Sequence, residues 1–215
     1  MRSGGDIYNL IITGVGGQGN VICSQLIGQA LVSKGYLVTI GETYGMAQRG
    51  GSVVSHIRIA RRKQPGPLIP NGKGDIVVAM EPIEALRVMR DYGNPDLVVI
   101  TNTRPVYPID VAIGDAIYPD FEEIKKALSS HSRRTYSIDA TGRAVQLGSP
   151  ILSNMIMMGA LLALKILPLN TEEFRHALSS RFGGKRLESN LVALEEGARM
   201  LLELPPAGPA NHGLS

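Results

Sequence analysis

Short runs of consecutive apolar residues recur along the chain and are separated by longer amphipathic stretches. The runs IYNLIIT (residues 7–13), DIVVAM (75–80) and DLVVITN (96–102) have the length and continuous apolar character of strands that are buried on both faces. Two further strands are expected at 36–42 and 134–141. This pattern is typical of a parallel sheet covered by helices.

One stretch has a different pattern. In SVVSHIRIA, residues 52–60, the side chains of Val53, Ser55, Ile57 and Ile59 share one face. Such alternation predicts a strand that is more exposed than the others.

The amphipathic stretches predict helices, and the last third of the chain is expected to be entirely helical. The helix that follows residue 80 carries Pro82 in its first turn, where proline is well tolerated. The expected helices are 18–34, 81–92, 121–130, 150–167, 171–182 and 187–204. Alternating strands and helices predict an α/β fold of Rossmann-like type, with a mostly parallel sheet flanked by helices and a helical C-terminal region. We expect a single domain over residues 1–204, followed by a flexible Pro- and Gly-rich tail at 205–215.

The composition of the chain argues against several classes of protein. The 215 residues include 44% hydrophobic and 19% charged residues, as in an ordinary globular protein with a real core. A net charge of +3, no Trp and only 5% aromatic residues argue against a nucleic-acid binder. The longest apolar run, near 155–167, is too short to cross a bilayer and is interrupted by Lys165. The N-terminal residues lack the apolar core of a signal peptide. We therefore expect a cytoplasmic protein without membrane contact.

Metal-binding residues are scarce. Cys23 is the only cysteine, so the chain cannot ligate an iron–sulfur cluster by itself. The four histidines, at 56, 131, 176 and 212, have no spacing that suggests a zinc site. We predict no metal site on this chain.

A glycine-rich loop follows the first expected strand and opens the first helix. Its glycines, Gly14, Gly16 and Gly19, fit the dinucleotide-binding fingerprint, and Glu42 ends the second strand near the position of a ribose-binding carboxylate. These features alone favour a nicotinamide- or flavin-dependent Rossmann oxidoreductase. The alternative is a tight, closely packed turn that binds nothing, with Glu42 as a solvated strand end.

The glycine loop GVGGQGNV (14–21) is followed about 30 residues later by YGMAQRGGSVVSHIRI (44–59). Together they closely resemble the gamma-type subunit of the 2-oxoacid:ferredoxin oxidoreductases. The segment Met-Ala-Gln-Arg-Gly-Gly most resembles the beta subunit of indolepyruvate ferredoxin oxidoreductase. The segments NMIMMGALLA and LESNLVALEEG also fit the family, so the resemblance covers nearly the whole chain. Asn20 and the pair Thr43-Tyr44 depart from the family pattern, the pair where the indolepyruvate type tends to carry His.

The resemblance implies a subunit without catalytic residues of its own. Complexes of this family decarboxylate a 2-oxoacid on thiamine diphosphate, pass electrons through iron–sulfur clusters to ferredoxin, and release an acyl-CoA. The chain has no Gly-Asp-Gly…Asn-Asn pattern for magnesium and thiamine diphosphate. The resemblance therefore places these cofactors on a larger partner subunit, with ferredoxin as an indirect partner. The isolated chain is expected to form a homodimer and to be inactive.

The resemblance also implies that the two glycine loops lie near coenzyme A, at the interface with the partner. The candidate binding residues are Gly14, Gly16, Gly17, Gln18, Gly19, Glu42, Arg49, Gly50 and Gly51. The guanidinium of Arg49 could contact an anion or form a salt bridge that fixes its loop. A local backbone contact is the favoured role of Gln18.

Other conspicuous residues have plainer interpretations. Cys23 is expected to be a buried small side chain. Met155, Met157 and Met158 are expected to pack in the core or in a subunit interface, and His56 is expected to be structural or on the surface.

Overall fold

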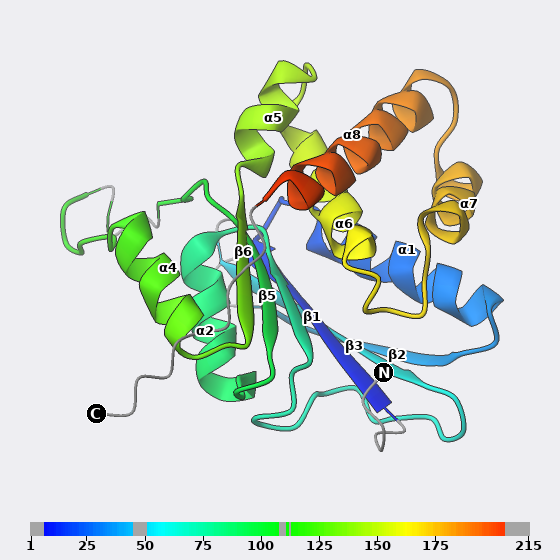
Figure 1. Cartoon of the computed structure of the whole chain (residues 1–215), viewed down its shortest axis with the longest axis horizontal. Coiled ribbons are helices and arrows are strands. Elements are labelled where there is room, and N and C mark those ends of the chain that lie inside the picture. Colours follow the sequence, from blue (N-terminus) through cyan, green and yellow to red (C-terminus); the bar gives the residue numbers. More distant parts are fainter. Residues whose placement is uncertain (1–6, 45–50, 108–110, 112, 205–215) are drawn as a thin grey trace.

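A computed structural model describes residues 7–44, 51–107, 111 and 113–204. Its centre is a six-stranded sheet with the strand order β2-β3-β1-β4-β5-β6 (Figure 1). The strands are β1 (Ile7–Val15), β2 (Leu37–Tyr44), β3 (Ser52–Ala60), β4 (Ile76–Ala79), β5 (Val98–Asn102) and β6 (Arg134–Ile138). Strands β1, β4, β5 and β6 pair in parallel, whereas β3 runs antiparallel to both β1 and β2. The expected α/β fold with a mostly parallel sheet is confirmed.

Strand β3 corrects one expectation from the sequence. It lies between β1 and β2, and six of its nine residues are buried, including His56 and Ile57. The prediction of a more exposed strand is wrong because β3 is an interior strand of the sheet, with helices on both of its faces. Its alternation arises from Ser and His side chains that face the interior.

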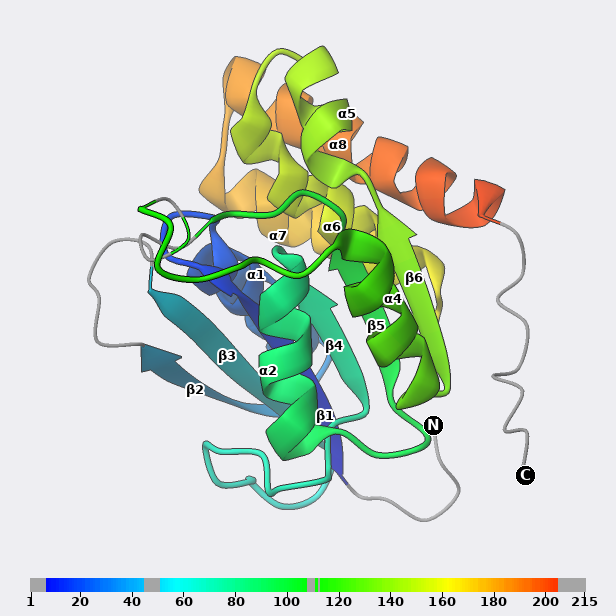
Figure 2. The ribbon, with the colours of Figure 1, turned by 90° about the vertical axis from the view of Figure 1, so that its left-hand side faces the viewer.

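Helices cover both faces of the sheet (Figure 2). Helices α2 and α4 pack on one face, over a core that includes Ile11, Val77 and Val99. Helices α1, α6 and their neighbours pack on the other face, over a larger core that includes Leu10 and Ile12. Neighbouring residues of β1 thus point to opposite cores, as the two-residue period of a strand requires.

The helices follow the predicted segments with two differences: an additional helix follows the last strand, and the helix expected at 150–167 is shorter and begins with a 3-10 turn. They are α1 (Asn20–Ser33), α2 (Pro82–Tyr92), α4 (Phe121–Ser130), α5 (Ala140–Gln146), α6 (Ser153–Ala163), α7 (Thr171–Arg181) and α8 (Gly184–Glu203), with a 3-10 turn η1 (Pro150–Leu152) before α6. Helix α5 corrects the prediction that the last strand extends to residue 141. The strand ends at Ile138 because Asp139 caps α5, and its carboxylate accepts a hydrogen bond from the Gly142 N–H at 2.8 Å.

Helix α6 lies in the middle of the larger core. Met155, Met157 and Met158 are each at most 1% exposed, so of the two expected locations, the core and a subunit interface, they occupy the core. Helix α8 crosses α6 at two glycines, Gly159 and Gly197, and either Cβ would lie within 2 Å of a carbonyl oxygen of the other helix. This close backbone contact holds the C-terminal helices against the sheet.

Candidate functional site

The first glycine loop connects the buried strand β1 to helix α1. Gly17 and Gly19 have φ angles of 99° and 86°, in the left-handed region that favours glycine. Gly19 is the N-cap of α1, and no side chain caps this helix. The N–H groups of the first helical turn therefore have no side-chain acceptor, an arrangement suited to an anion.

Gln18 is part of the turn itself. Its Oε1 accepts a hydrogen bond from the Val15 N–H at 2.7 Å, and its Nε2 donates to the Met80 carbonyl at 3.2 Å. The expected local backbone contact is thus present. A Cβ on Gly14 would lie 2.4 Å from Gln18 Oε1 and 2.9 Å from Met80 Cβ. Gly14 is required here for packing.

The two glycine loops meet through their backbones. The Gly16 N–H donates to the Gly51 carbonyl at 2.9 Å, so both loops lie at the same edge of the sheet. The next residue, Ser52, donates through its hydroxyl to Glu84 Oε2 at 2.5 Å, and Glu84 is paired with Arg87 at 2.7 Å. Arg49 and Gly50 lie outside the described residues.

Glu42 lies farther from the glycine loop than its position in the sequence suggested. Because β3 is inserted between β1 and β2, Glu42 pairs with Ser55, and Ser55 in turn pairs with Ile12 of β1. Two strand spacings, about 10 Å, separate Glu42 from β1. Its carboxylate accepts hydrogen bonds from the Tyr44 hydroxyl and, at 3.4 Å, from Ser24. Glu42 does not line the hollow of the glycine loop.

A hollow of about 510 Å³ lies over the first glycine loop. Its lining includes Gly16, Gly17 and Gly19 of the loop, together with Tyr44 and Arg181. The Arg181 Nη1 donates to Gln25 Oε1 at 3.0 Å, which holds the guanidinium beside the start of α1. Neither Tyr44 nor Arg181 was predicted from the sequence as a site residue. Arg181 reaches the loop only through the packing of α7 on α1.

A polar network extends the site along the carboxyl ends of the other strands. Asn102, at the end of β5, donates to the Met80 carbonyl at 3.0 Å and to Thr141 Oγ1 at 2.8 Å. Its Oδ1 accepts from the Ala140 and Thr141 N–H groups. The Met80 carbonyl therefore joins Gln18 to Asn102. Asn102 could not be recognised from the sequence, because its partners come from segments far apart in the chain.

Glu81 follows β4 at the same edge and is fully buried. It accepts hydrogen bonds from the Tyr118 hydroxyl, from the Glu84 N–H at 3.0 Å and from the Val106 N–H at 3.3 Å. Burial raises the pKa of Glu81, and it also raises that of Tyr118. Glu81 thus ties the segment after β5 to the start of α2.

The remaining conspicuous side chains are structural. Cys23 is completely buried, and burial raises the pKa of its thiol to about 12. His56 is also completely buried, against the edge of the Tyr92 ring, and burial lowers the pKa of its imidazole. His56 is therefore structural, not on the surface. Within the described parts of the chain, no three His, Cys, Asp or Glu residues lie close enough to hold a metal ion, and no helix is long and apolar enough to cross a membrane.

The described groups around the hollow are suited to binding an anion. The described residues that line it supply backbone N–H groups, one arginine and one tyrosine, and none of these residues carries a carboxylate, thiol or imidazole. Such groups can hold an anion and orient it.

A protein family and several known proteins are similar to this chain along most of its length. The family model described as pyruvate ferredoxin/flavodoxin oxidoreductase matches residues 9–200. The indolepyruvate oxidoreductase subunit IorB of Pyrococcus horikoshii is 35% identical over 198 residues, which cover 92% of this chain and 97% of that protein. The match thus extends over nearly the full length of both chains.

Solved structures share the fold. The gamma subunit of a keto/oxoacid ferredoxin oxidoreductase from Geobacter sulfurreducens superimposes with a TM-score of 0.68 at 20% identity, covering 92% of this chain and 98% of that one. A 2-oxoglutarate:ferredoxin oxidoreductase from Magnetococcus marinus, solved with 2-oxoglutarate, coenzyme A and succinyl-CoA, gives a TM-score of 0.73 at 21% identity. That match covers 95% of this chain but only 32% of the longer chain. With two glycine loops joined at one edge of this sheet, and with a family model that matches most of its length, this chain belongs to the pyruvate ferredoxin/flavodoxin oxidoreductase family.

Proposed function

We propose that this chain is the small, non-catalytic subunit of an indolepyruvate-type 2-oxoacid:ferredoxin oxidoreductase. The complete enzyme would oxidatively decarboxylate an aryl 2-oxoacid, transfer the acyl group to coenzyme A and reduce ferredoxin. The observation that carries this proposal is the 35% identity to IorB along nearly the full length of both chains. The proposed location is the cytoplasm.

The redox and thiamine cofactors are proposed to reside on a larger partner subunit. An iron–sulfur cluster needs several cysteine thiolates, whereas this chain has one cysteine. That cysteine, Cys23, is buried and remains a neutral thiol at physiological pH because its pKa is raised to about 12. The residues of this chain therefore do not fit a cluster.

The glycine loops are proposed to face coenzyme A at the boundary with that partner. The uncapped start of α1, the Gly16–Gly51 hydrogen bond and the nearby Arg181 support this proposal, because together they suit a phosphate group. In this proposal the described loop residues would bind coenzyme A, and the reaction at the carbon atoms of the 2-oxoacid would take place on the partner. In this arrangement the small subunit binds and orients, and the larger subunit carries out the chemistry.

The direct test is co-expression with the larger subunit, followed by an assay of 2-oxoacid-dependent reduction of methyl viologen. We expect a stable heteromer that oxidises indolepyruvate more efficiently than pyruvate or 2-oxoglutarate, and an isolated small subunit that is colourless and inactive. An iron–sulfur absorption band or viologen reduction by this chain alone would overturn the proposal.

The second loop offers a more specific test through Arg49. If its guanidinium makes a bidentate contact with an anion across the subunit boundary, Lys cannot fully replace it. Arg49→Lys should then weaken subunit affinity, or raise the KM for coenzyme A, by about ten- to a hundredfold. The measurement is subunit affinity and coenzyme A dependence in the reconstituted complex, with the melting temperature of the isolated subunit as control. If subunit affinity and the KM for coenzyme A are both unchanged, Arg49 only fixes its loop.

A further inference from the structure

A buried carboxylate near the glycine loops has no role in the function proposed above. Glu84 lies in the first turn of α2, and only 2% of this residue is exposed. A buried carboxylate is costly unless other groups pair with it. Arg87 forms an ion pair with Glu84 Oε1 at 2.7 Å, and the Ser52 hydroxyl donates to Glu84 Oε2 at 2.5 Å. Both carboxylate oxygens therefore have partners, and one partner belongs to strand β3.

Ser52 lies where the two glycine loops meet. It is the first residue of β3 and pairs with Val15, the last residue of β1. Directly beyond this pair, the Gly16 N–H donates to the Gly51 carbonyl at 2.9 Å. The first loop leaves β1 here, and the second loop enters β3. Glu84 therefore bonds to the sheet at the junction of both loops.

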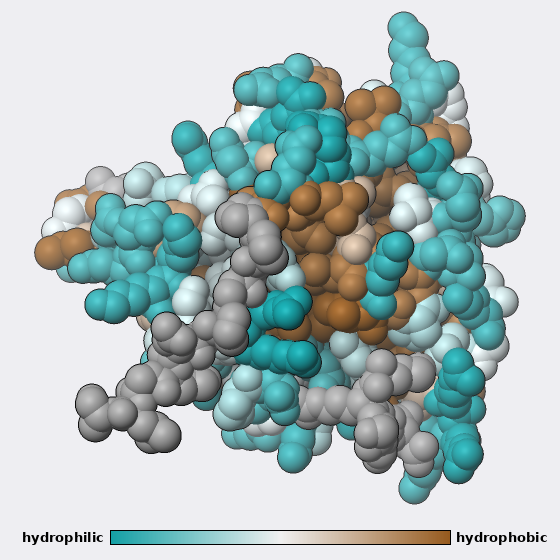
Figure 3. Space-filling model, viewed as in Figure 1, coloured by the Kyte–Doolittle hydropathy of each residue, from teal (hydrophilic) through white to brown (hydrophobic). Residues whose placement is uncertain are grey.

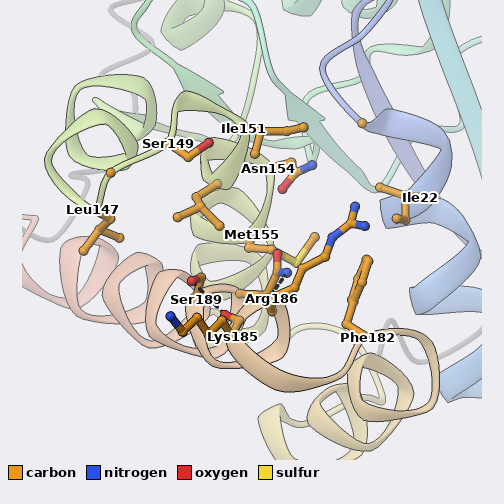
Figure 4. Close-up of a pocket in the computed structure, with 14 residues that line it drawn as sticks. Ile22, Leu147, Ser149, Ile151, Asn154, Met155, Phe182, Lys185, Arg186 and Ser189 are labelled. Carbon is orange, nitrogen blue, oxygen red and sulfur yellow. Dashed lines mark hydrogen bonds between the residues drawn. The ribbon is translucent and has the colours of Figure 1, made fainter.

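The two loops are held in place by different side chains. In the first loop, the side chain of Gln18 forms two hydrogen bonds to the backbone. Asn154 of α6 points its amide nitrogen toward the start of α1, and this Nδ2 donates to the Gln18 carbonyl at 3.4 Å (Figure 4). At the end of the second loop, Glu84 is the only described residue whose side chain bonds to Gly51 or Ser52. The position of the second loop at the junction therefore depends on Glu84.

The first turn of α2 is itself held firmly. Glu81 is the N-cap of this helix, and its Oε2 accepts a hydrogen bond from the Glu84 N–H at 3.0 Å. The other oxygen of Glu81 accepts from the Tyr118 hydroxyl and from the Val106 N–H at 3.3 Å. Hydrogen bonds to an ionised carboxylate are about twice as strong as those between neutral groups. The side chain of Glu84 thus extends to Ser52 from a fixed base.

We propose that Glu84 is a positioning residue of the ligand site, which acts through Ser52 to fix the junction of the two glycine loops and so sets the affinity for coenzyme A. This inference rests on the function proposed above. Glu84 is not among the described residues that line the hollow over the first loop, whereas Gly16 and Gly17 are. A displaced junction would move the backbone of these glycines, and a small misplacement of binding groups weakens a ligand contact strongly.

Amide hydrogen exchange of the isolated full chain tests the positioning. Ser52→Ala and Glu84→Ala remove the same charge-assisted hydrogen bond, so the Gly16 amide should exchange at least about tenfold faster in both variants. The double variant should exchange no faster than Glu84→Ala alone, because the bond is lost only once. Glu84→Gln keeps an acceptor for the Ser52 hydroxyl and should stay close to the wild type. The reference is the Asp75 amide, which bonds to the Asn9 carbonyl at 2.9 Å at the other edge of the sheet.

Kinetics of the reconstituted complex test the link to the ligand. Ser52→Ala and Glu84→Ala should raise the KM for coenzyme A at least about tenfold at a nearly unchanged kcat, because they weaken binding and leave the reacting groups intact. A merely structural role would instead lower the kcat, or the amount of active complex, at an unchanged KM. The control is Arg90→Gln, because Arg90 is exposed on the same helix and pairs with Asp91.

Two results would overturn the proposal. One is an unchanged exchange rate of the Gly16 amide in Ser52→Ala, a variant that decides the matter even where Glu84→Ala does not fold. The other is faster exchange of this amide at an unchanged KM for coenzyme A. A wild-type complex whose activity does not depend on coenzyme A would instead overturn the proposed function, since the exchange measurement requires neither coenzyme A nor the larger subunit.

Discussion

At the scale of single residues, hydrogen bonds to the backbone hold the candidate site in shape. Gln18 and Asn102 both donate to the Met80 carbonyl, so one oxygen joins the glycine loop to the ends of β4 and β5. The sequence predicted the local contact of Gln18 because its partner Val15 is only three residues away. Asn102 and Arg181 could not be predicted in this way, since their roles depend on how separate elements pack.

The buried His56 leads to a prediction about pH. Its ring nitrogens have no hydrogen-bond partner among the described residues, and burial lowers the pKa of the imidazole below its usual value near 6.5. The neutral form is therefore favoured in the folded state, and protonation favours unfolding. The contribution to stability is fully present above about pH 6.5 and is lost as the pH falls through the lower folded-state pKa, with a slope of at most about 1.4 kcal/mol per pH unit.

His56→Leu should remove this part of the pH dependence and raise the free energy of unfolding near pH 5. Chemical denaturation of the wild type and the variant between about pH 7 and pH 5 measures the effect. The matched control is His176→Gln, because His176 is exposed on α7 and its replacement should leave the curve unchanged. Parallel curves for His56→Leu and the wild type would contradict the prediction.

At the scale of elements, the strands and most helices could be predicted from the periodicity of apolar residues. A long run of such residues is compatible with few other secondary structures. Helix α4 occupies the predicted residues, and β1 and α2 differ from the prediction by at most two residues at an end. The insertion of β3 between β1 and β2 could not be predicted, because pairing order is a tertiary property. Helix α5 was not predicted because a segment of seven residues is too short for a helical repeat of apolar residues to be recognised.

The crossing of α6 and α8 is the element contact most sensitive to a single methyl group. In Gly159→Ala the new Cβ would lie 1.9 Å from the Leu194 carbonyl oxygen and 3.0 Å from the Ala198 nitrogen, both backbone atoms. The helices would have to separate, and we expect a loss of stability of about 1–3 kcal/mol. Gly66→Ala is the control, because its Cβ would meet only the Arg58 Nη1 at 3.8 Å. Equal stability of the two variants, by thermal or chemical unfolding, would show that α6 and α8 can shift without cost.

At the scale of the whole molecule, apolar residues gather on one face, below α8 and around the end of α6 (Figure 3). A hollow of about 490 Å³ lies at this end of α6, lined by apolar side chains that include Leu162, Leu167 and Leu202. Leu202 is 73% exposed on the last turn of α8. A large exposed apolar surface is typical of a contact between subunits.

We therefore expect the isolated chain to self-associate as a dimer through this face, and Leu202→Asp to shift the dimer toward monomer. A buried carboxylate without a partner would oppose association, whereas the exposed position of Leu202 in the monomer should leave the melting temperature close to that of the wild type. Sedimentation equilibrium over a range of protein concentrations measures the association constant, and the expected loss is at least about tenfold. Val192→Asp serves as the control, because Val192 is 50% exposed on the same helix and does not line this hollow. A wild-type chain that stays monomeric at all concentrations, or equal weakening by both substitutions, would show that this face is not the site of self-association.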